Sequence, residues 1–185
     1  MKHQLLQNME RKKPFTDNNP KMIQLSEAST KDIKTIQEIV KISWPHTYGK
    51  ILSESQITFM LNLLYSNEML HRNFNNGHHF LLANEGVTCV GFASYEHQYQ
   101  NKKQTRLHKL YVLPQAQKKG VGQLLIETIE NKAKANNDLS LSLNVNRFNL
   151  SYLFYQKMGF KIIGEEDLAI GNGYFMEDYK MEKVL

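Results

Sequence analysis

Hydrophobic and polar positions along the chain repeat with two different periods, which predicts a mixed fold of helices and strands. A repeat near 3.6 residues marks the apolar face of a helix, and a repeat of two marks a half-buried strand. The clearest helical repeat runs from Ile57 to Leu64. The clearest strand repeat runs from Leu139 to Asn146, where leucine and valine alternate with serine and asparagine. Because the chain switches between the two periods several times, we expect an α/β fold.

The pattern predicts about seven strands and about four helices. A serine followed three residues later by an acid or a glutamine marks two helix starts, at Ser29 and Ser53. The first helix is expected to end at Trp44, because the proline that follows disfavours helical geometry in the residue before it. The other predicted helices cover residues 119–135 and 149–158. The predicted strands cover residues 22–25, 78–83, 87–95, 106–113, 139–146, 160–163 and 174–181.

Length and charge distribution predict one folded domain with a basic extension. The chain has 185 residues, which suits a single domain. Residues 1–21 hold five lysine or arginine residues against two acids, so they carry +3 of the formal net charge of +5. Since they show little periodicity, we expect a basic N-terminal tail or extension, followed by one domain over residues 22–185. The domain itself is not expected to bind nucleic acid, and association through the tail is a hypothesis that removal of the tail would test.

Cysteine usage and the lengths of apolar runs indicate where the protein works. The single cysteine, Cys89, excludes an intramolecular disulfide, and its apolar surroundings favour a small buried hydrophobe over a nucleophile. The apolar runs are far shorter than the roughly 20 residues of a transmembrane helix. The start of the chain lacks the apolar core of a signal peptide. We therefore expect a cytoplasmic protein without a membrane partner.

The chemistry is concentrated where a predicted strand turns into the helix near residue 119. The turn reads Gln117-Lys118-Lys119-Gly120-Val121-Gly122. Glycine lets backbone amides approach a ligand closely, and the first amides of a helix lack partners within it. The helix dipole and the two lysines add positive potential, so the turn favours an anion. The alternative is a tight turn that binds no ligand.

Common phosphate and metal motifs do not fit this sequence. A P-loop requires a glycine-lysine pair followed by serine or threonine, which is absent. A dinucleotide fingerprint requires a third glycine at the position of Leu125. No metal is expected, because the adjacent His78 and His79 lack the spacing and the companion ligands of a zinc site.

Three segments in order resemble the GNAT N-acetyltransferase superfamily. Leu110-Tyr111-Val112-Leu113-Pro114 is similar to the family's L-Y-V-x-P strand, and Gln117–Gly122 matches its Q/R-x-x-G-x-G/A turn. Further along, Phe154-Tyr155-Gln156-Lys157-Met158-Gly159-Phe160 is similar to F-Y-x-K-x-G-F. The resemblance covers about residues 22–185. It implies a mixed, mostly antiparallel sheet in which two parallel strands, here residues 106–113 and 139–146, splay apart at a cofactor cleft.

The resemblance also implies a binding site for acetyl-CoA in that cleft. The pyrophosphate would rest on backbone N–H groups of residues 118–123, while Leu110 and Val112 would pair with the pantetheine arm like an added strand. Asn149 would hydrogen-bond the arm, although it stands six residues before Tyr155, where relatives often have seven. The implied cofactor-binding residues are Leu110, Tyr111, Val112, Gln117, Lys118, Lys119, Gly120, Val121, Gly122, Gln123, Asn149 and Tyr155.

The implied reaction is direct transfer of an acetyl group from acetyl-CoA to a primary amine in a ternary complex. Tyr155 would give a proton to the departing thiolate. Many relatives carry a glutamate base where this chain has Arg106, which stays protonated and cannot serve. His108 lies two residues on, hence on the same strand face, and is the candidate base. Glu96, His97 and water are the alternatives.

The sequence does not identify the acceptor amine or the oligomeric state. A polyamine, an amino acid, an antibiotic amine and a protein N-terminus all present a small-molecule or peptide amine, and a homodimer is one option because relatives are often dimers. Arg106 at the base position leaves a second hypothesis, a CoA-binding regulatory or interaction module without turnover. Trp44 and Tyr48, with loop 45–53, form a lid over an acceptor pocket in one interpretation and ordinary helix packing in the other.

Overall fold

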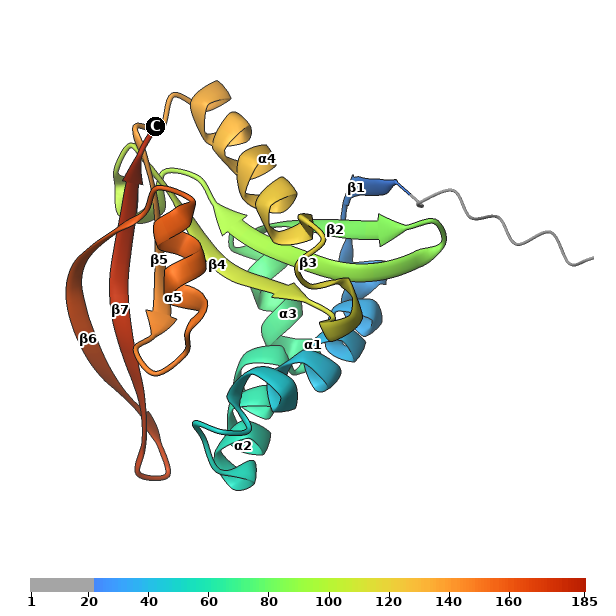
Figure 1. The fold of residues 1–185 in the computed structure, drawn as a ribbon, viewed down its shortest axis with the longest axis vertical. Coiled ribbons are helices and arrows are strands. Elements are labelled where there is room, and N and C mark those ends of the chain that lie inside the picture. The colour runs from blue at the N-terminus through green and yellow to red at the C-terminus, as the bar shows by residue number, and fades with distance from the viewer. Residues whose placement is uncertain (1–21) are drawn as a thin grey trace, which may run out of the picture.

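A seven-stranded sheet with helices on both faces makes up residues 22–185, the part of the chain that the computed structural model describes (Figure 1). The predicted basic extension over residues 1–21 lies outside the described residues. The strands are β1 (Ile23–Glu27), β2 (His79–Glu85), β3 (Thr88–Glu96), β4 (Gln104–Val112), β5 (Ser140–Asn146), β6 (Lys161–Gly171) and β7 (Tyr174–Val184). The α-helices are α1 (Ile33–Tyr48), α2 (Glu54–Tyr65), α3 (Asn67–Asn75), α4 (Val121–Ala135) and α5 (Ser151–Lys157). None of these helices combines the length and the apolar composition needed to cross a membrane.

The order of the sheet is β1-β2-β3-β4-β5-β7-β6, and every neighbouring pair is antiparallel except β4 and β5. Parallel pairing between these two strands runs from Gln104 and Ser140 to Leu107 and Leu143. Beyond that point, both strands continue without pairing to each other, so they part. The predicted fold class, with a splayed parallel pair in a mostly antiparallel sheet, is confirmed.

Each face of the sheet buries its own apolar layer. Helix α4 presents Leu125, Ile126 and Ile129 to one face, where they pack with Leu141 and Met181 of the strands. Helices α1 to α3 cover the other face, with a layer that includes Ile36, Val40, Trp44, Leu70, Phe80 and Phe92. In Figure 1, α4 lies above β2 and β3, and α1 and α2 lie below them. Strand β4 contributes side chains to both layers, which fixes its position from two sides.

Helix α1 runs further than the sequence predicts. It continues through Pro45 to Tyr48, so the expected end at Trp44 is wrong. A proline inside a helix removes one backbone hydrogen bond. Trp44 offsets that loss, because its buried ring packs against Tyr48 and Tyr65 and holds the last turn in place. The helix then ends at Gly49, whose amide donates to the Pro45 carbonyl at 2.9 Å.

Two further elements differ from the sequence-based prediction: one helix is not predicted, and one strand is longer than predicted. Helix α3 was not foreseen as a separate helix, since its only buried residue is Leu70 and its apolar repeat is weak. Ser66 starts it, because the Ser66 hydroxyl accepts a hydrogen bond from the Met69 amide at 3.2 Å. Strand β6 extends to Gly171 rather than ending near residue 163, and all its side chains are exposed or half-exposed, which leaves no apolar repeat to detect.

The β6–β7 hairpin reaches across to α2 at its tip, as the lower part of Figure 1 shows. The Tyr174 hydroxyl donates to Ser55 Oγ at 3.0 Å, and its ring lies 5.5 Å from that of Phe59. The Gln56 side-chain amide donates to the Phe175 carbonyl at 3.3 Å. These contacts bring the hairpin alongside the gap between β4 and β5 and give that gap a further wall.

Leu125 provides a test of the layer beneath α4. Replacement by alanine removes a side chain that is 0% exposed and leaves a cavity. We expect the free energy of unfolding to fall by about 2–5 kcal/mol. The matched control is Leu139→Ala, because that side chain is 62% exposed and its loss should change the free energy by no more than about 0.5 kcal/mol. Urea unfolding followed by circular dichroism measures both, and equal losses would contradict the assignment of this layer as core.

Candidate active site

A cavity of about 720 Å³ opens where β4 and β5 part. Its walls come from α1, α2, β4, β5, β7, the start of α5 and the turn before α4. Residues of that turn contribute to its lining, together with tyrosine and charged residues of the other elements. Both the volume and the mixture of apolar walls with a few polar groups are typical of a small-molecule site.

The turn before α4 presents unpaired backbone amides to the cavity. The backbone is left-handed at Lys118 (φ 62°) and at Gly120 (φ 83°), and turns of this kind direct successive amides toward one anion. None of the six amides of residues 118–123 has a hydrogen-bond acceptor within residues 22–185. Three of them are also the first amides of α4, so the helix dipole adds positive potential. We call this group of amides the amide cradle.

Side chains of the same motif shape the cradle. Gln117 donates from Nε2 to the Val112 carbonyl at 3.1 Å and so ties the turn to the end of β4. Gly122 lies against the Phe154 ring, since a Cβ added at this glycine would come within 3.3 Å of it. Of the two predicted lysines, Lys118 lines the cavity, whereas Lys119 does not.

Strand β4 offers one free edge to the cavity. Residues 109–112 pair with β3 on one side but have no strand partner on the side of β5, where only the Val112 carbonyl is taken, by the Gln117 side chain. Alternate N–H and C=O groups on that edge are open to an extended ligand. Leu110 and Val112 pack toward the α4 layer, whereas Tyr111 packs toward the opposite layer, 6.1 Å from the Trp44 ring. An extended ligand would therefore meet backbone groups here, as the sequence predicts for Leu110 and Val112.

The segment around the start of α5 brings Asn149 and Tyr155 to the cavity. Asn149 is 7% exposed, and its Oδ1 accepts a hydrogen bond from the Ser151 amide at 2.9 Å. Tyr155 is 9% exposed and packs edge-on against Phe160. Burial raises the pKa of Tyr155, so its hydroxyl keeps its proton at neutral pH and acts as a hydrogen-bond donor.

Aromatic side chains of α1, α2 and β4 form another wall of the cavity. Trp44 packs against Tyr48, Tyr65 and Tyr111, with ring centroids 4.9, 5.6 and 6.1 Å away. Burial raises the pKa of all three tyrosines, which stay neutral. Since Trp44 is 2% exposed and residues 45–48 belong to α1, the structure favours the helix-packing interpretation of this segment over a lid.

Arg106 and His108 lie on the same side of β4, since both contact the Tyr99 ring. His108 stands in a β-bulge, and its Nε2 lies 2.8 Å from Glu96 Oε2. Its ring stacks on His78 with 4.1 Å between centroids. Burial, with the positive charges nearby, lowers the pKa of His108, and its Nε2 is already hydrogen-bonded to Glu96. His108 is thus a neutral, weakly basic imidazole at pH 7.

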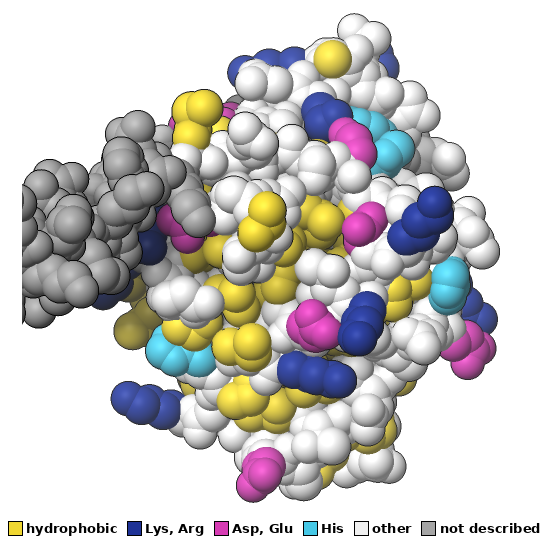
Figure 2. Space-filling view, turned by 90° about the vertical axis from the view of Figure 1, so that its right-hand side faces the viewer, with side chains coloured by type: hydrophobic (Ala, Val, Ile, Leu, Met, Phe, Trp, Pro, Cys, Tyr) yellow, Lys and Arg dark blue, Asp and Glu magenta, His cyan; other side chains and the backbone are white. Residues whose placement is uncertain are grey.

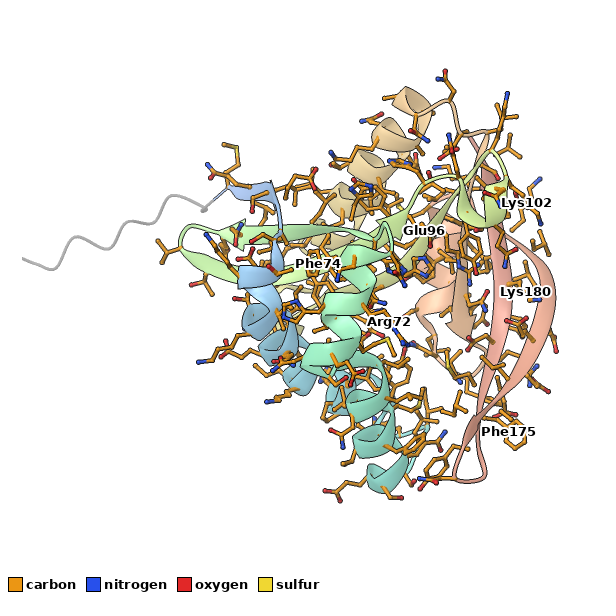
Figure 3. All side chains as sticks on the ribbon, turned by 180° about the vertical axis from the view of Figure 1, so that it is seen from behind. Arg72, Phe74, Glu96, Lys102, Phe175 and Lys180 are labelled. Carbon is orange, nitrogen blue, oxygen red and sulfur yellow. The ribbon has the colours of Figure 1, made fainter. Side chains whose placement is uncertain are left out.

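His78, Glu96 and His108 form a cluster that the sequence does not reveal, and Figure 3 marks Glu96 at the end of β3. Their possible ligand atoms lie within 4.8 Å of one another. The two imidazole planes differ by only 15°, however, so their in-plane lone pairs do not converge on one ion. Lys109 adds positive charge close by. We interpret the cluster as stacked, hydrogen-bonded side chains.

The two alternative bases, Glu96 and His97, do not line the cavity. His97 Nδ1 lies 2.8 Å from Thr105 Oγ1 and 3.1 Å from Asp138 Oδ2. Glu96 reaches the cavity only through His108. Neither residue is therefore positioned to accept a proton directly from a molecule inside the cavity.

The sequence-based prediction omits several residues that line the cavity, among them Lys109, Asn144 and Asp178. Asp178 is 6% exposed, and burial together with Glu166 raises the pKa of its carboxyl to about 6, against the opposing effect of Arg106. Asn144 donates from Nδ2 to Glu166 at 3.0 Å, while its buried Oδ1 has no partner within residues 22–185. Asn144 and Asp178 stand at polar positions of strands, which ordinarily face solvent, so their alternation gives no signal of burial.

Most surface charges near the cavity are balanced. Arg147 lies 3.0 Å from Glu165 and 2.8 Å from Asp167, and Lys180, labelled in Figure 3, lies 2.7 Å from Glu166. Basic and acidic side chains are also interspersed over the face of the molecule in Figure 2. The small acidic group at residues 165–167 is therefore largely paired, and it offers little free negative charge.

Comparison with known proteins decides the family. A family model described as an acetyltransferase (GNAT) domain matches residues 50–183. A spermidine N(1)-acetyltransferase from Thermoplasma acidophilum is 32% identical over 161 residues, which cover 84% of this chain and 96% of the relative. The chain belongs to the GNAT acetyltransferase family. The resemblance carried by the three sequence motifs is confirmed.

Solved structures of GNAT acetyltransferases share this architecture. The PaiA N-acetyltransferase from Thermoplasma acidophilum, in complex with coenzyme A, matches with a TM-score of 0.74 and 30% identity, over 89% of this chain and 99% of the other. The ribosomal-protein-S18-alanine N-acetyltransferase from Escherichia coli matches with a TM-score of 0.67 and 16% identity, over 88% and 94% of the two chains, which shows the fold alone. The protein is an acyltransferase of this family, as the sequence predicts.

Proposed function

We propose that this GNAT acetyltransferase moves the acetyl group of acetyl-CoA to a primary amine by direct attack in a ternary complex. The observation that carries the proposal is the amide cradle at one end of a cavity that continues along the free edge of β4. A diphosphate joined to an extended, amide-containing arm matches these two features in order. The similar PaiA enzyme, solved with coenzyme A, supports the same assignment.

The residues present fit coenzyme A by their chemistry. The amide cradle and Lys118 would hold the pyrophosphate. The backbone groups of Leu110 and Val112 would pair with the amides of the pantetheine arm. Asn149 Oδ1 accepts from the Ser151 amide, so its Nδ2 is the group that would donate to the arm. Acetyl-CoA supplies the activated acyl group, and the chain supplies binding, orientation and proton transfer.

Proton removal from the acceptor is assigned to Asp178. An aliphatic amine with a pKa near ~10 is protonated at pH 7, so it needs a base before it can attack. Asp178 faces the cavity, and with a pKa of about 6 it is ionised at pH 7 and can bind the ammonium and take a proton. Asn144 Oδ1 is a second acceptor for the same ammonium. His108 stays the sequence-based alternative, although Glu96 occupies its Nε2.

Protonation of the departing thiolate is assigned to Tyr155. Its hydroxyl is protonated at neutral pH, so it can donate a hydrogen bond to the sulfur and then a proton. The negative charge that develops on the carbonyl oxygen needs a fixed donor, for which the backbone amides of Leu110 and Val112 are the candidates. The neutral amine attacks the carbonyl carbon, and the carbon–sulfur bond breaks.

The acceptor is proposed to be a small-molecule or peptide amine. Spermidine is the first compound to test, because the relative at 32% identity carries its name. The aromatic wall suits an aliphatic chain, whereas the paired acids at residues 165–167 offer little attraction to a polycation. A free amino acid and a peptide with a free N-terminus are the necessary comparisons.

A CoA-binding module without turnover is the second hypothesis, which Arg106 in place of the usual glutamate favours. Asp178 weakens this argument, because it supplies a cavity carboxylate from another strand. Thiol release from acetyl-CoA in the presence of an amine panel separates the two hypotheses. We expect steady release with at least one amine. Coenzyme A binding without release for every amine would support the module.

The Tyr155→Phe variant tests the proposed acid. It keeps the ring packing and removes only the hydroxyl, so we expect kcat to fall by roughly 100-fold with the KM for acetyl-CoA nearly unchanged. The control is Tyr152→Phe, since Tyr152 packs on Tyr179 and does not line the cavity. Steady-state kinetics measure both variants. Full activity in the Tyr155→Phe enzyme would remove this residue from the mechanism.

The Asp178→Asn variant tests the proposed base through pH. Because the Asp178 carboxyl has a pKa of about 6, kcat/KM of the wild type should decline below that pH. The variant should lose this dependence and roughly 100-fold of its activity at pH 7.5. The control is Asp167→Asn, whose carboxylate pairs with Arg147 at the surface. An unchanged pH profile in Asp178→Asn would rule out the assignment.

The same variant should gain stability while it loses activity. A carboxyl whose pKa is higher in the folded state than in the unfolded state disfavours folding once it ionises, and this cost grows between about pH 4 and pH 6. We therefore expect Asp178→Asn to melt at a higher temperature than the wild type, by more at pH 8 than at pH 5. Thermal unfolding at the two pH values measures the difference. A lower Tm at pH 8 would show that the carboxylate stabilises the fold.

A further inference from the structure

Lys109 is a partly buried amine that forms no ion pair with an acid in the described chain. It lies on β4 and lines the cavity. Its Nζ is 5.4 Å from the centre of the Tyr65 ring, and within residues 22–185 it forms no ion pair. In contrast, Lys132 and Lys180 each lie beside a glutamate. An aromatic face in place of a carboxylate stabilises a buried ammonium only in part.

The surroundings of Lys109 raise the neutral fraction of its amine. Burial lowers the pKa of Lys109 to about 8, so about one amine in ten is unprotonated at pH 7 and about half at pH 8. A neutral lysine amine is a nucleophile toward carbonyl carbon. Lys118 lines the same cavity at the cradle but is exposed, which makes it a matched comparison.

The position of Lys109 along β4 places it near the acyl end of the proposed donor. From the amide cradle, the arm runs back along the free edge of β4, past Val112 and then Leu110. Lys109 is the next residue, and the free edge closes where β4 meets β5 again at Leu107. The thioester and the Lys109 amine therefore share the inner half of one cavity. This step rests on the proposed function.

We propose that Lys109 is a self-acetylation site. When no acceptor amine is bound, the neutral Nζ attacks the carbonyl carbon of acetyl-CoA bound to the same chain. A carbon–nitrogen bond forms and the carbon–sulfur bond breaks. The proton lost from the nitrogen passes to the departing sulfur, so the products are N-acetyl-lysine at position 109 and free coenzyme A.

Acetylation of Lys109 would change the acceptor end of the cavity. It replaces an ammonium with a neutral, longer side chain beside Tyr65 and Tyr111, where the aromatic wall limits space. The modified enzyme would therefore accept amines less well. Because an acceptor amine and Lys109 compete for the same acyl group, a saturating acceptor would protect Lys109.

The test is peptide mapping by mass spectrometry after incubation of the full chain with acetyl-CoA and no amine. We expect Lys109 to gain one acetyl group at least about 10-fold faster than Lys118, because the donor is held beside it. The rate per chain should not depend on protein concentration, which marks an intramolecular reaction. Chain unfolded in urea is the control for chemical acetylation, and its lysines should react without preference for Lys109.

The outcomes separate this inference from the proposed function. Preferential Lys109 acetylation that an effective acceptor amine suppresses supports the inference. Thiol release with an amine while Lys109 reacts no faster than Lys118 overturns the self-acetylation and leaves the proposed function standing. Absence of both coenzyme A binding and thiol release overturns the proposed function itself. The Lys109→Arg variant confirms the site, since the acetyl group should then be missing from this peptide.

Discussion

The parting of β4 from β5 is the feature on which the other parts of the site depend. Backbone groups inside a sheet need hydrogen-bond partners, and past Leu107 one edge of β4 has none from the neighbouring strand. The aromatic layer under Tyr111 and the α4 layer hold β4 on both faces, so the strand cannot move to close the gap. The amide cradle, residues 118–123, follows one short turn after the end of the same strand. In the proposed function, this free edge and the row of free amides would act as one elongated binding site.

The cavity also contains two titratable side chains whose charged forms are disfavoured by their surroundings. The pKa of Asp178 is raised and that of Lys109 is lowered, and burial is the main cause in both cases. Each group therefore lowers the free energy of unfolding relative to an apolar residue at the same position, and the two apolar layers compensate for this loss. Perturbed titrating groups gathered in a cleft are characteristic of functional sites. The proposed base and the proposed self-acetylation site are two consequences of the same burial.

The sequence predicts much of this arrangement because its signals are local. Alternation predicts the strand at 139–146, and the glycine-rich turn predicts the amides at the start of α4. The long β6 strand escapes prediction because its side chains are not buried, and α1 passes Pro45 because tertiary packing of Trp44 outweighs a local preference. Asp178 and Lys109 are also invisible in the sequence, since polar positions on strands usually face water. The helices and the hairpin that cover this side of the sheet, a property of the whole fold, enclose those positions.

Nuclear magnetic resonance of backbone amides tests the central claim most directly. The chain would be titrated with coenzyme A and, separately, with pantetheine, which lacks the pyrophosphate. The account predicts that the amides of residues 118–123 shift only with coenzyme A, whereas those of Leu110 and Val112 shift with both compounds. If saturating coenzyme A left the amides of residues 118–123 unchanged, the cradle would not be a diphosphate site and the account would be contradicted.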